Sequence, residues 1–264
     1  MISIGRWIMT APLVRRTVRD GVAVLRLADP DRRNALSKQL SDDLAEAVGN
    51  ALAQGARALV LTAEPPVFCA GGSLAGLLSR EVPLARMYAG YQALAEAAVP
   101  TVAAVGGPAI GAGVNLPLAC DIVIAAESAR FDPRFLDAGI HPGGGHLWRL
   151  ARRVGPQGAA ALVLCGDALT GREAAERGLA WRCVPDGEVE ETALELARRA
   201  AGRPAALVRR TKWTLRESLA LDDPAEAAAL ELAAQQWSVE QPEFVEIVTR
   251  LHERISGRSG SVRE

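Results

Sequence analysis

The sequence has few aromatic residues, few histidines and no closely spaced cysteines. Only 4% of its 264 residues are aromatic, and it contains 3 histidines and 4 cysteines. Cys69, Cys120, Cys165 and Cys183 form no C-x-x-C pair and have no histidine at metal-ligand spacing. These absences argue against a disulfide-stabilised secreted domain and against a zinc site. We therefore predict four unpaired thiols in a reducing, cytoplasmic environment and no bound metal.

Neither sign of charge dominates the sequence. Lys and Arg total 30 against 31 Asp and Glu, which gives a net charge of −1 and no general attraction to nucleic acid or to an anionic membrane. The longest apolar stretch, Val99 to Cys120, is interrupted by Pro100, Pro108 and Pro117, so it reads as strand, loop and helix and not as a membrane span. We expect neither nucleic acid nor a membrane as a partner.

Strands and helices alternate over the first two thirds of the chain. Residues 13–18 and 22–27 alternate in polarity around Asp20-Gly21, which predicts a β-hairpin. Apolar residues then recur at helical spacing after Ser37, a candidate N-cap. A further helix is expected over residues 84–98, and further strands over residues 58–62, 101–105, 121–126 and 181–184. This order predicts the α/β fold class.

The last third of the chain is helical in pattern. From Gly187 onward apolar residues recur at helical spacing, with breaks at residues 202–204, 222–224 and 241–242. We expect a core domain over residues 1–200 and a helical region over residues 201–264. The apolar faces of that region need something to pack on, and both a separate bundle and a subunit interface meet this need.

Two glycine-rich turns are the first candidates for a functional site. Residues 70–73 and 110–113 each follow a strand and precede a helix. Such turns expose unpaired backbone N–H groups at helix N-termini, and two converging turns could hold one carbonyl oxygen as an oxyanion hole. Plain tight turns are the alternative. Neither turn contains a phosphate-binding G-x-x-x-x-G-K-[ST] or a complete G-x-G-x-x-G dinucleotide motif.

In these segments the sequence resembles the crotonase family, the enoyl-CoA hydratase/isomerase superfamily. The resemblance covers roughly Val14 to Arg254 and is carried by four segments in the same order and spacing. The four segments are DPDRRNAL at 29–36, VFCAGG at 67–72, VAAVGGPAIGAG at 102–113 and ACDIVIAAESARF at 119–131.

The resemblance implies a fold, an assembly and a ligand. The implied fold is a crotonase fold, a spiral of repeated ββα units, in which the C-terminal helices build a homotrimer or hexamer. The implied ligand is an acyl-CoA thioester, so that coenzyme A enters as part of the substrate and no cofactor is tightly bound. By position, the backbone N–H groups of Gly72 and Ala112 correspond to the oxyanion hole that stabilises the thioester enolate.

The resemblance also implies where coenzyme A lies. Arginine suits phosphate because its planar guanidinium donates two parallel hydrogen bonds. The residues implied near pantetheine, phosphates, adenine and thioester are Arg32, Arg33, Ala35, Ala70, Gly72, Ser73, Leu74 and Ala75. A basic residue from a neighbouring subunit's C-terminal helices is a further possibility in the family, and Lys212 and Arg254 are the candidates here.

The sequence departs from the family at both positions where hydratases carry glutamates. These positions hold Asn115 and Phe135, neither of which exchanges a proton near neutral pH. Asn115 can still orient a water or a substrate oxygen, and Phe135 is expected to line an acyl pocket. Asp137, His141 and His146 are the candidate substitute bases. The alternatives are an ion pair or cap for Asp137 and hydrogen-bonded loop positions for the histidines.

The favoured interpretation is an enoyl-CoA hydratase/isomerase-type enzyme that stabilises a thioester enolate. Isomerisation needs one movable base, so it survives the loss of both glutamates better than hydration does. The first alternative is an acyl-CoA-binding protein with little or no turnover. Assembly through the C-terminal helices without a ligand, and a hydrolase triad built on Ser73, are weaker alternatives because both glycine turns are retained and Ser73 lacks a G-x-S-x-G turn.

Overall fold

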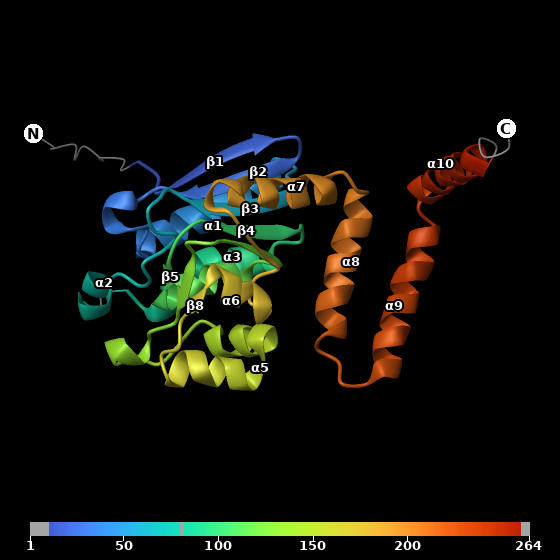
Figure 1. Ribbon diagram of the computed structural model, residues 1–264. Coiled ribbons are helices and arrows are strands. Elements are labelled where there is room, and N and C mark those ends of the chain that lie inside the picture. The colour runs from blue at the N-terminus through green and yellow to red at the C-terminus, as the bar shows by residue number, and fades with distance from the viewer. Residues whose placement is uncertain (1–10, 80–81, 260–264) are drawn as a thin grey trace, which may run out of the picture. The chain divides into compact units, whose positions relative to one another are not determined.

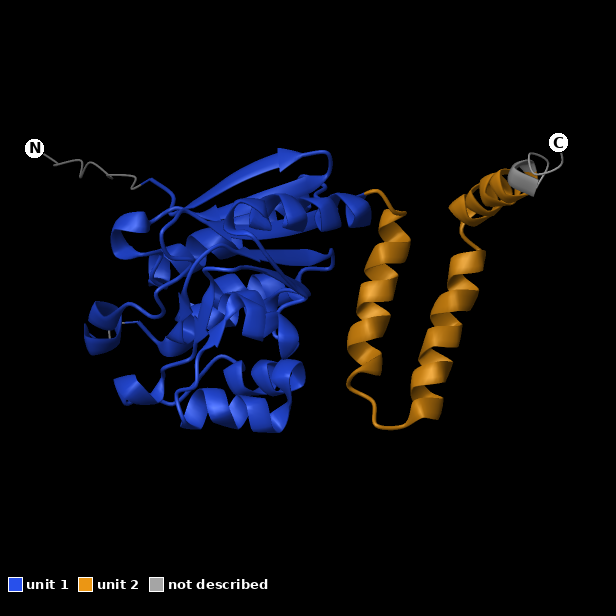
Figure 2. Cartoon of the chain, viewed as in Figure 1, with its two compact units in different colours: residues 1–201 blue, residues 202–264 orange. Residues whose placement is uncertain are grey.

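The chain divides into two compact units. The computed structural model describes residues 11–79 and 82–259. The first unit comprises residues 1–201 and the second residues 202–264 (Figure 2). The first unit mixes strands and helices, and the described residues of the second form helices joined by short turns.

A six-stranded sheet forms the centre of the first unit (Figure 1). Its first two strands pair antiparallel as the hairpin predicted at Asp20-Gly21, and every other neighbouring pair is parallel. In spatial order the strands are β1 Val14–Arg19, β2 Val22–Leu27, β3 Ala58–Ala63, β4 Thr101–Val105, β6 Ile122–Ala126 and β9 Arg182–Val184.

The first unit also contains a second, smaller sheet. It consists of β5 Ala109–Ile110, β7 Arg130–Asp132 and β8 Leu169–Thr170. The chain repeatedly makes one strand of the large sheet, then one strand of the small sheet, and then a helix, as in β4, β5 and the helix that follows Gly111. This repetition is the spiral of ββα units, and the α/β prediction is confirmed.

Helices separate these strands, and local sequence sets their ends. Ser37 caps α1 by accepting a hydrogen bond from the Leu40 N–H at 3.1 Å, as predicted. Thr170 and Glu173 form a capping box at the start of α6. The α-helices of this unit are α1 Lys38–Ala53, α2 Leu74–Ser79, α3 Ala89–Glu96, α4 Asn115–Ala119, α5 His146–Leu164, α6 Gly171–Glu176 and α7 Val189–Ala201.

The prediction of a single helix over residues 84–98 is wrong in detail. The structure has a 3-10 helix, η2 Leu84–Tyr88, followed by α3. The Ser41 hydroxyl lies at the junction, where it donates to the Met87 carbonyl oxygen at 3.1 Å and accepts from the Gly90 N–H at 3.0 Å. In a continuous helix these two backbone groups would be hydrogen-bonded within the helix. Because Ser41 provides their partners instead, its side chain stabilises the break.

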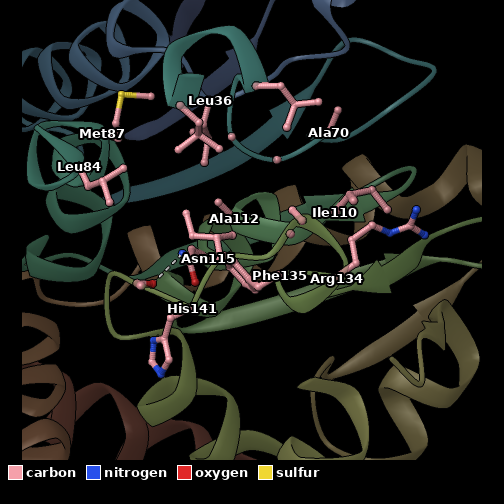
Figure 3. Close-up of a pocket in the computed structure, with 18 of the residues that line it drawn as sticks. Leu36, Ala70, Leu84, Met87, Ile110, Ala112, Asn115, Arg134, Phe135 and His141 are labelled. Atoms are coloured by element: carbon pink, nitrogen blue, oxygen red, sulfur yellow. Dashed lines mark hydrogen bonds between the residues drawn. The ribbon is translucent and has the colours of Figure 1, made fainter. Parts of the chain in front are cut away.

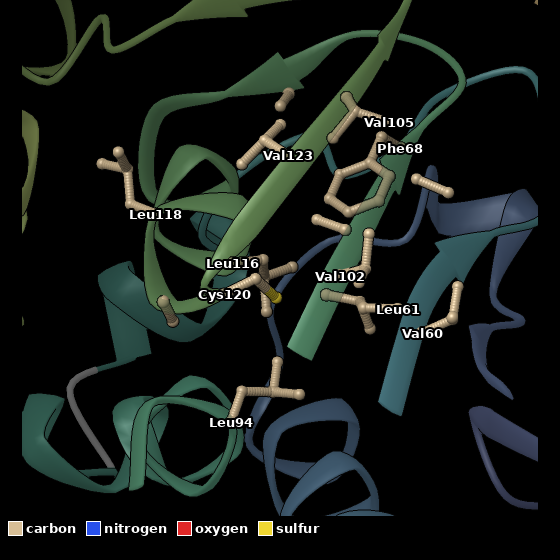
Figure 4. Packing of buried hydrophobic residues seen from close by; sticks show 14 of the residues in the cluster. Val60, Leu61, Phe68, Leu94, Val102, Val105, Leu116, Leu118, Cys120 and Val123 are labelled. Atoms are coloured by element: carbon tan, nitrogen blue, oxygen red, sulfur yellow. The ribbon is translucent and has the colours of Figure 1, made fainter. Parts of the chain in front are cut away.

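The hydrophobic core lies between the large sheet and the helices that cover it. Figure 4 shows Phe68 beside Val105 of β4, with Val102 of β4, Leu61 of β3 and Val123 of β6 in the same cluster. All six residues of β3 except Ala63 are buried, and β4 is buried throughout. Continuous apolar strands of this kind are typical of a parallel sheet covered on both faces.

The described residues of the second unit contain three helices. These are α8 Ala205–Ser218, α9 Pro224–Val239 and α10 Pro242–Ser259. The guanidinium of Arg210 on α8 lies 5.0 Å from the ring centre of Trp213 and 5.7 Å from that of Trp237 on α9. The helix α8 begins directly after the first predicted break, and α9 and α10 begin at the last residue of the second and third, so the predicted breaks are confirmed.

Within the described part of the chain, every helix is too short or too polar to cross a lipid bilayer.

The crossing of α1 and α3 gives a matched pair of test substitutions. A Cβ atom at Gly90 would lie 2.8 Å from the Ser41 carbonyl oxygen and 3.0 Å from the Leu44 Cβ. We expect Gly90→Ala to lower the free energy of unfolding by about 1–3 kcal/mol, because overpacking forces the helices apart. Gly49→Ala, on α1 with no atom within 4 Å of its added Cβ, should stabilise by about 0.5–1 kcal/mol. Urea unfolding of both variants measures the difference, and equal effects would contradict this account.

Candidate active site

A cavity of about 600 Å³ opens beside both predicted glycine-rich turns. Residues 70–72 and 110–112 line one part of it, residues 84–91 form an apolar wall, and residues 134–143 close the remaining side. Figure 3 shows Leu36 and Ala70 facing Ala112 and Phe135 across this space. All of these residues belong to the first unit.

The backbone N–H of Gly72 takes no part in the bridge to Leu36, because the neighbours of Gly72 make its hydrogen bonds. Leu36 and Gly72 form a parallel bridge, in which the Leu36 N–H donates to the Gly71 carbonyl oxygen at 2.7 Å and the Ser73 N–H donates to the Leu36 carbonyl oxygen at 2.9 Å. In a parallel bridge the flanking residues make the hydrogen bonds, so the N–H of Gly72 itself points to the opposite side.

The second glycine-rich turn packs closely against the neighbouring residue, Gly71. A Cβ atom at Gly71 would lie 2.8 Å from the Ile110 carbonyl oxygen and 3.7 Å from the Ala112 nitrogen, and Gly71 has a φ of +95°. Only glycine therefore permits this approach of the two turns. Ala112 is the second residue of the 3-10 helix η3 Gly111–Val114, where an N–H has no partner inside the helix. Gly72 and Ala112 both line the same cavity.

A buried asparagine ties the preceding loop to this site. Asn34 donates from Nδ2 to the carbonyl oxygens of Glu64 at 2.9 Å and Val67 at 2.7 Å, and its Oδ1 accepts from the Asp29 N–H at 2.9 Å. The Ala70 N–H donates to the Arg33 carbonyl oxygen at 3.0 Å. These bonds hold the loop of residues 29–36 alongside residues 64–73.

Asn115, at the start of α4, is buried in the cavity wall with 1% of its surface exposed. Its Nδ2 donates to the Gly143 carbonyl oxygen at 3.3 Å, drawn as a dashed line in Figure 3, and its Oδ1 lies 2.8 Å from Nδ1 of His146. Phe135 also lines the cavity, and its ring packs edge-on against His146 at 4.8 Å between centres. Both positions that could have held carboxylates are therefore neutral.

The three candidate bases have different surroundings. Asp137 and His141 both line the cavity and are exposed. Nδ1 of His141 lies 2.7 Å from the Pro142 carbonyl oxygen, and Figure 3 shows its ring directed away from Asn115 and Phe135. His146 is buried outside the cavity lining, and burial, with the nearby charge of Arg149, lowers its pKa to about 4. Asp137 is the carboxylate that lines the cavity within the described residues.

The alternative ion pair between Asp137 and Arg134 is not formed. Arg134 instead pairs with the buried Asp132, which also lies 3.3 Å from Arg130. The alternative interpretation of Ser73 as a cap fits the structure, because its Oγ accepts from the Gly76 N–H at 3.3 Å in the first turn of α2.

The other predicted residues divide into two groups. Ala70, Gly72 and Leu74 line the cavity. The residues in adjoining segments that do not line it are Arg32, Arg33, Ala35, Ser73 and, in α2, Ala75. Arg32 and Arg33 are exposed, and Arg32 lies 3.5 Å from Asp29. Lys212, which is buried, and Arg254, which is exposed, belong to the second unit.

The sequence analysis missed the apolar wall and its two tyrosines. Leu84, Met87, Tyr88 and Tyr91 line the cavity, and the tyrosine rings lie 5.4 Å apart. Burial raises the pKa of both phenols, so both remain neutral hydroxyls near pH 7. Their spacing across residues 88–91 was the available signal, because it places both side chains on one helix face.

The fold and the cavity define the class of this protein as an α/β protein of the crotonase fold. The crystal structure of enoyl-CoA hydratase from Bacillus anthracis superposes with a TM-score of 0.83 at 26% identity, covering 92% of this chain and 96% of that chain.

The chain belongs to the enoyl-CoA hydratase/isomerase family, whose model matches residues 17–256. A Mycobacterium tuberculosis relative named "Probable enoyl-CoA hydratase EchA14" is 41% identical over 84% of this chain and 91% of its own. The 2,3-dehydroadipyl-CoA hydratase of Escherichia coli is 33% identical over 80% of this chain and 83% of its own. The predictions of fold and family are confirmed.

The buried neutral imidazole of His146 predicts a specific dependence of stability on pH. Below about pH 6.5 the unfolded chain binds a proton at this histidine, whereas the folded chain does so only near pH 4. The free energy of unfolding should therefore fall as the pH drops from 7 to 4, by up to about 3 kcal/mol more than in His146→Asn, which has no proton to bind. Urea unfolding across this range measures both profiles. Parallel profiles would show that His146 does not contribute.

Proposed function

We propose that this protein binds an acyl-CoA thioester and stabilises the enolate formed from it. The observation that carries the proposal is the approach of two glycine-rich turns in which Gly72 and Ala112 line one cavity and have N–H groups without partners in their own turns. Two such donors suit a thioester carbonyl oxygen, because negative charge grows on that oxygen as a C2 proton leaves.

The coenzyme portion is proposed to lie along the loop of residues 29–36. Arg32 and Arg33 are exposed on this loop, beside the cavity-lining Ala70, to which Arg33 is joined by a backbone hydrogen bond. One guanidinium group donates two parallel hydrogen bonds to a phosphate, so this loop suits the phosphate groups of coenzyme A. The apolar wall at residues 84–91 then suits the acyl chain.

Asp137 is the proposed base. It lines the cavity, the salt bridge of Arg134 is made to Asp132 instead, and a carboxylate can move a proton between carbons of a bound acyl chain. One movable base suffices for isomerisation of a double bond. Hydration by paired carboxylates is disfavoured, because Asn115 and Phe135 are neutral. The same two residues favour a second candidate function, an acyl-CoA-binding protein with little turnover.

Assembly and location extend the proposal. The helices of the second unit expose large apolar side chains, among them Leu215 at 59%, Leu219 at 61% and Val245 at 67%. Such a surface favours a homotrimer or hexamer over a monomer. All four cysteines are free, which suits a protein that works in the cytoplasm without disulfides.

Removal of one proposed oxyanion donor tests the enolate directly. The measurement is exchange of the C2 hydrogens of a saturated acyl-CoA with deuterated water. Ala112→Pro deletes the N–H and should slow exchange by about 10²–10³, whereas Ala112→Gly keeps the N–H as a matched control. Equal exchange in both folded variants would contradict the oxyanion role of Ala112. Saturable binding without exchange in the wild type would instead support the acyl-CoA-binding function, and no binding would overturn the proposal.

The identity of the base has its own test. Asp137→Asn should slow C2 exchange by about 10²–10⁴, since the amide cannot accept the proton, while acyl-CoA affinity is retained. Asp20→Asn, an exposed change in the turn between β1 and β2 and outside the cavity lining, is the control. If His141→Ala slows C2 exchange and Asp137→Asn does not, the base is His141. Normal exchange in both variants would exclude both residues.

A further inference from the structure

Aromatic side chains are concentrated in the cavity of the first unit. Aromatic residues make up only 4% of the chain, which contains 2 tyrosines and 4 phenylalanines. Both tyrosines, Tyr88 and Tyr91, line this cavity, and so does Phe135. The oxyanion role proposed for Gly72 and Ala112 makes no use of these rings, so their concentration here needs an explanation of its own.

The two tyrosine rings form a fixed wall between residues 88–91 and the loop of residues 143–145. Their ring centres lie 5.4 Å apart, and the ring planes are inclined by 43°. A side chain at Gly143 would overlap the Tyr88 hydroxyl group, and a side chain at Gly144 would overlap the Tyr91 hydroxyl group. Two consecutive glycines thus give both rings room to reach this loop, and the close packing holds the rings in place.

Arg149, on α5, supports this wall from outside the cavity lining. Its guanidinium group lies 5.7 Å from the ring centre of Tyr91 and donates a hydrogen bond to the Gly144 carbonyl oxygen at 2.7 Å. One side chain therefore holds both the ring and the loop on which the ring packs. A wall that is already ordered loses little conformational entropy when a ligand binds against it.

Phe135 supplies a third ring in another part of the cavity. Its ring contact is with His146, and within the described residues it is in ring contact with neither tyrosine. Figure 3 shows Leu84 and Met87 of η2 on one side of the space and Phe135 on another. The cavity of about 600 Å³ has a volume that is usual for small-molecule pockets. A ligand ring in it therefore has aromatic surface available on more than one side.

We propose that Tyr88, Tyr91 and Phe135 select acyl-CoA thioesters whose acyl group carries an aromatic ring over thioesters that carry a saturated ring of similar size. The inference rests on the proposed binding of an acyl-CoA thioester. Aromatic pairs prefer offset or edge-to-face contacts, because the electron-rich face of one ring attracts the positive edge of another. A saturated ring lacks such a face and gains only from the apolar area that it buries.

The test compares two ligands that differ only in their ring. 3-Phenylpropionyl-CoA and 3-cyclohexylpropionyl-CoA have the same number of carbon atoms, and calorimetry on the full chain measures both dissociation constants. We expect the phenyl ligand to bind about 3–10-fold more tightly, which is the value of an aromatic pair beyond its buried area. Hydrophobic burial alone would favour the cyclohexyl ligand, because its ring has the larger apolar surface.

Substitutions assign the preference to the rings. Tyr88→Leu, at a half-buried position, should lower the preference about twofold or more, whereas Tyr88→Phe keeps the ring and should preserve it. Phe135→Leu tests the other part of the cavity in the same way and does not depend on the folding of Tyr88→Leu. Trp181→Leu removes an exposed aromatic residue outside the cavity lining, so it is the matched control and should keep the wild-type preference.

Each result bears on a different part of the proposal. A wild-type preference at or below one, with both ligands bound, would overturn this inference and leave the proposed function intact. Binding of butyryl-CoA but of neither ring-bearing ligand would do the same. An undiminished preference in both Tyr88→Leu and Phe135→Leu would overturn the assignment to these rings, and binding of none of the three thioesters would overturn the proposed function itself.

Discussion

The parallel bridge between Leu36 and Gly72 is the constraint on which the site depends. It joins the loop after β2 to the turn after β3, and it uses the N–H of Ser73 and the carbonyl oxygen of Gly71 while leaving the Gly72 amide turned away. The second turn packs against Gly71 closely enough to exclude any larger residue. Three segments that are far apart in sequence thus meet at one edge of the sheet, and Asn34 holds the first of them in place.

The chemistry of the cavity differs from that of a paired-carboxylate site. Asn115 and Phe135 supply an amide and a ring, the buried His146 remains neutral near pH 7, and Asp137 supplies a carboxylate at the exposed side. Burial likewise raises the pKa of the Cys69 thiol, between the two turns, to about 12, so it is not a nucleophile. Negative charge on the thioester oxygen would therefore be stabilised mainly by backbone N–H dipoles, which are positioned by the fold and do not depend on particular side chains.

Local signals in the sequence predicted most of the fold. The hairpin, the Ser37 cap and the breaks between the C-terminal helices depend on residues close together in the chain. The break between η2 and α3 was missed because it depends on Ser41, which lies 46 residues before Met87. The partnership of Asn115 with His146 spans 31 residues and has no local pattern. The sequence analysis therefore grouped His146 with the candidate bases, although the structure buries it behind the cavity wall.

The central claim is that the amides of Gly72 and Ala112 act together on one thioester oxygen. The infrared stretching frequency of a ¹³C-labelled thioester carbonyl reports the hydrogen bonds to that oxygen. The account predicts that the frequency falls when the labelled acyl-CoA binds, because two preorganised donors polarise the C=O bond more than water does. A carbonyl frequency in the complex equal to that in water, at saturating protein, would contradict the claim.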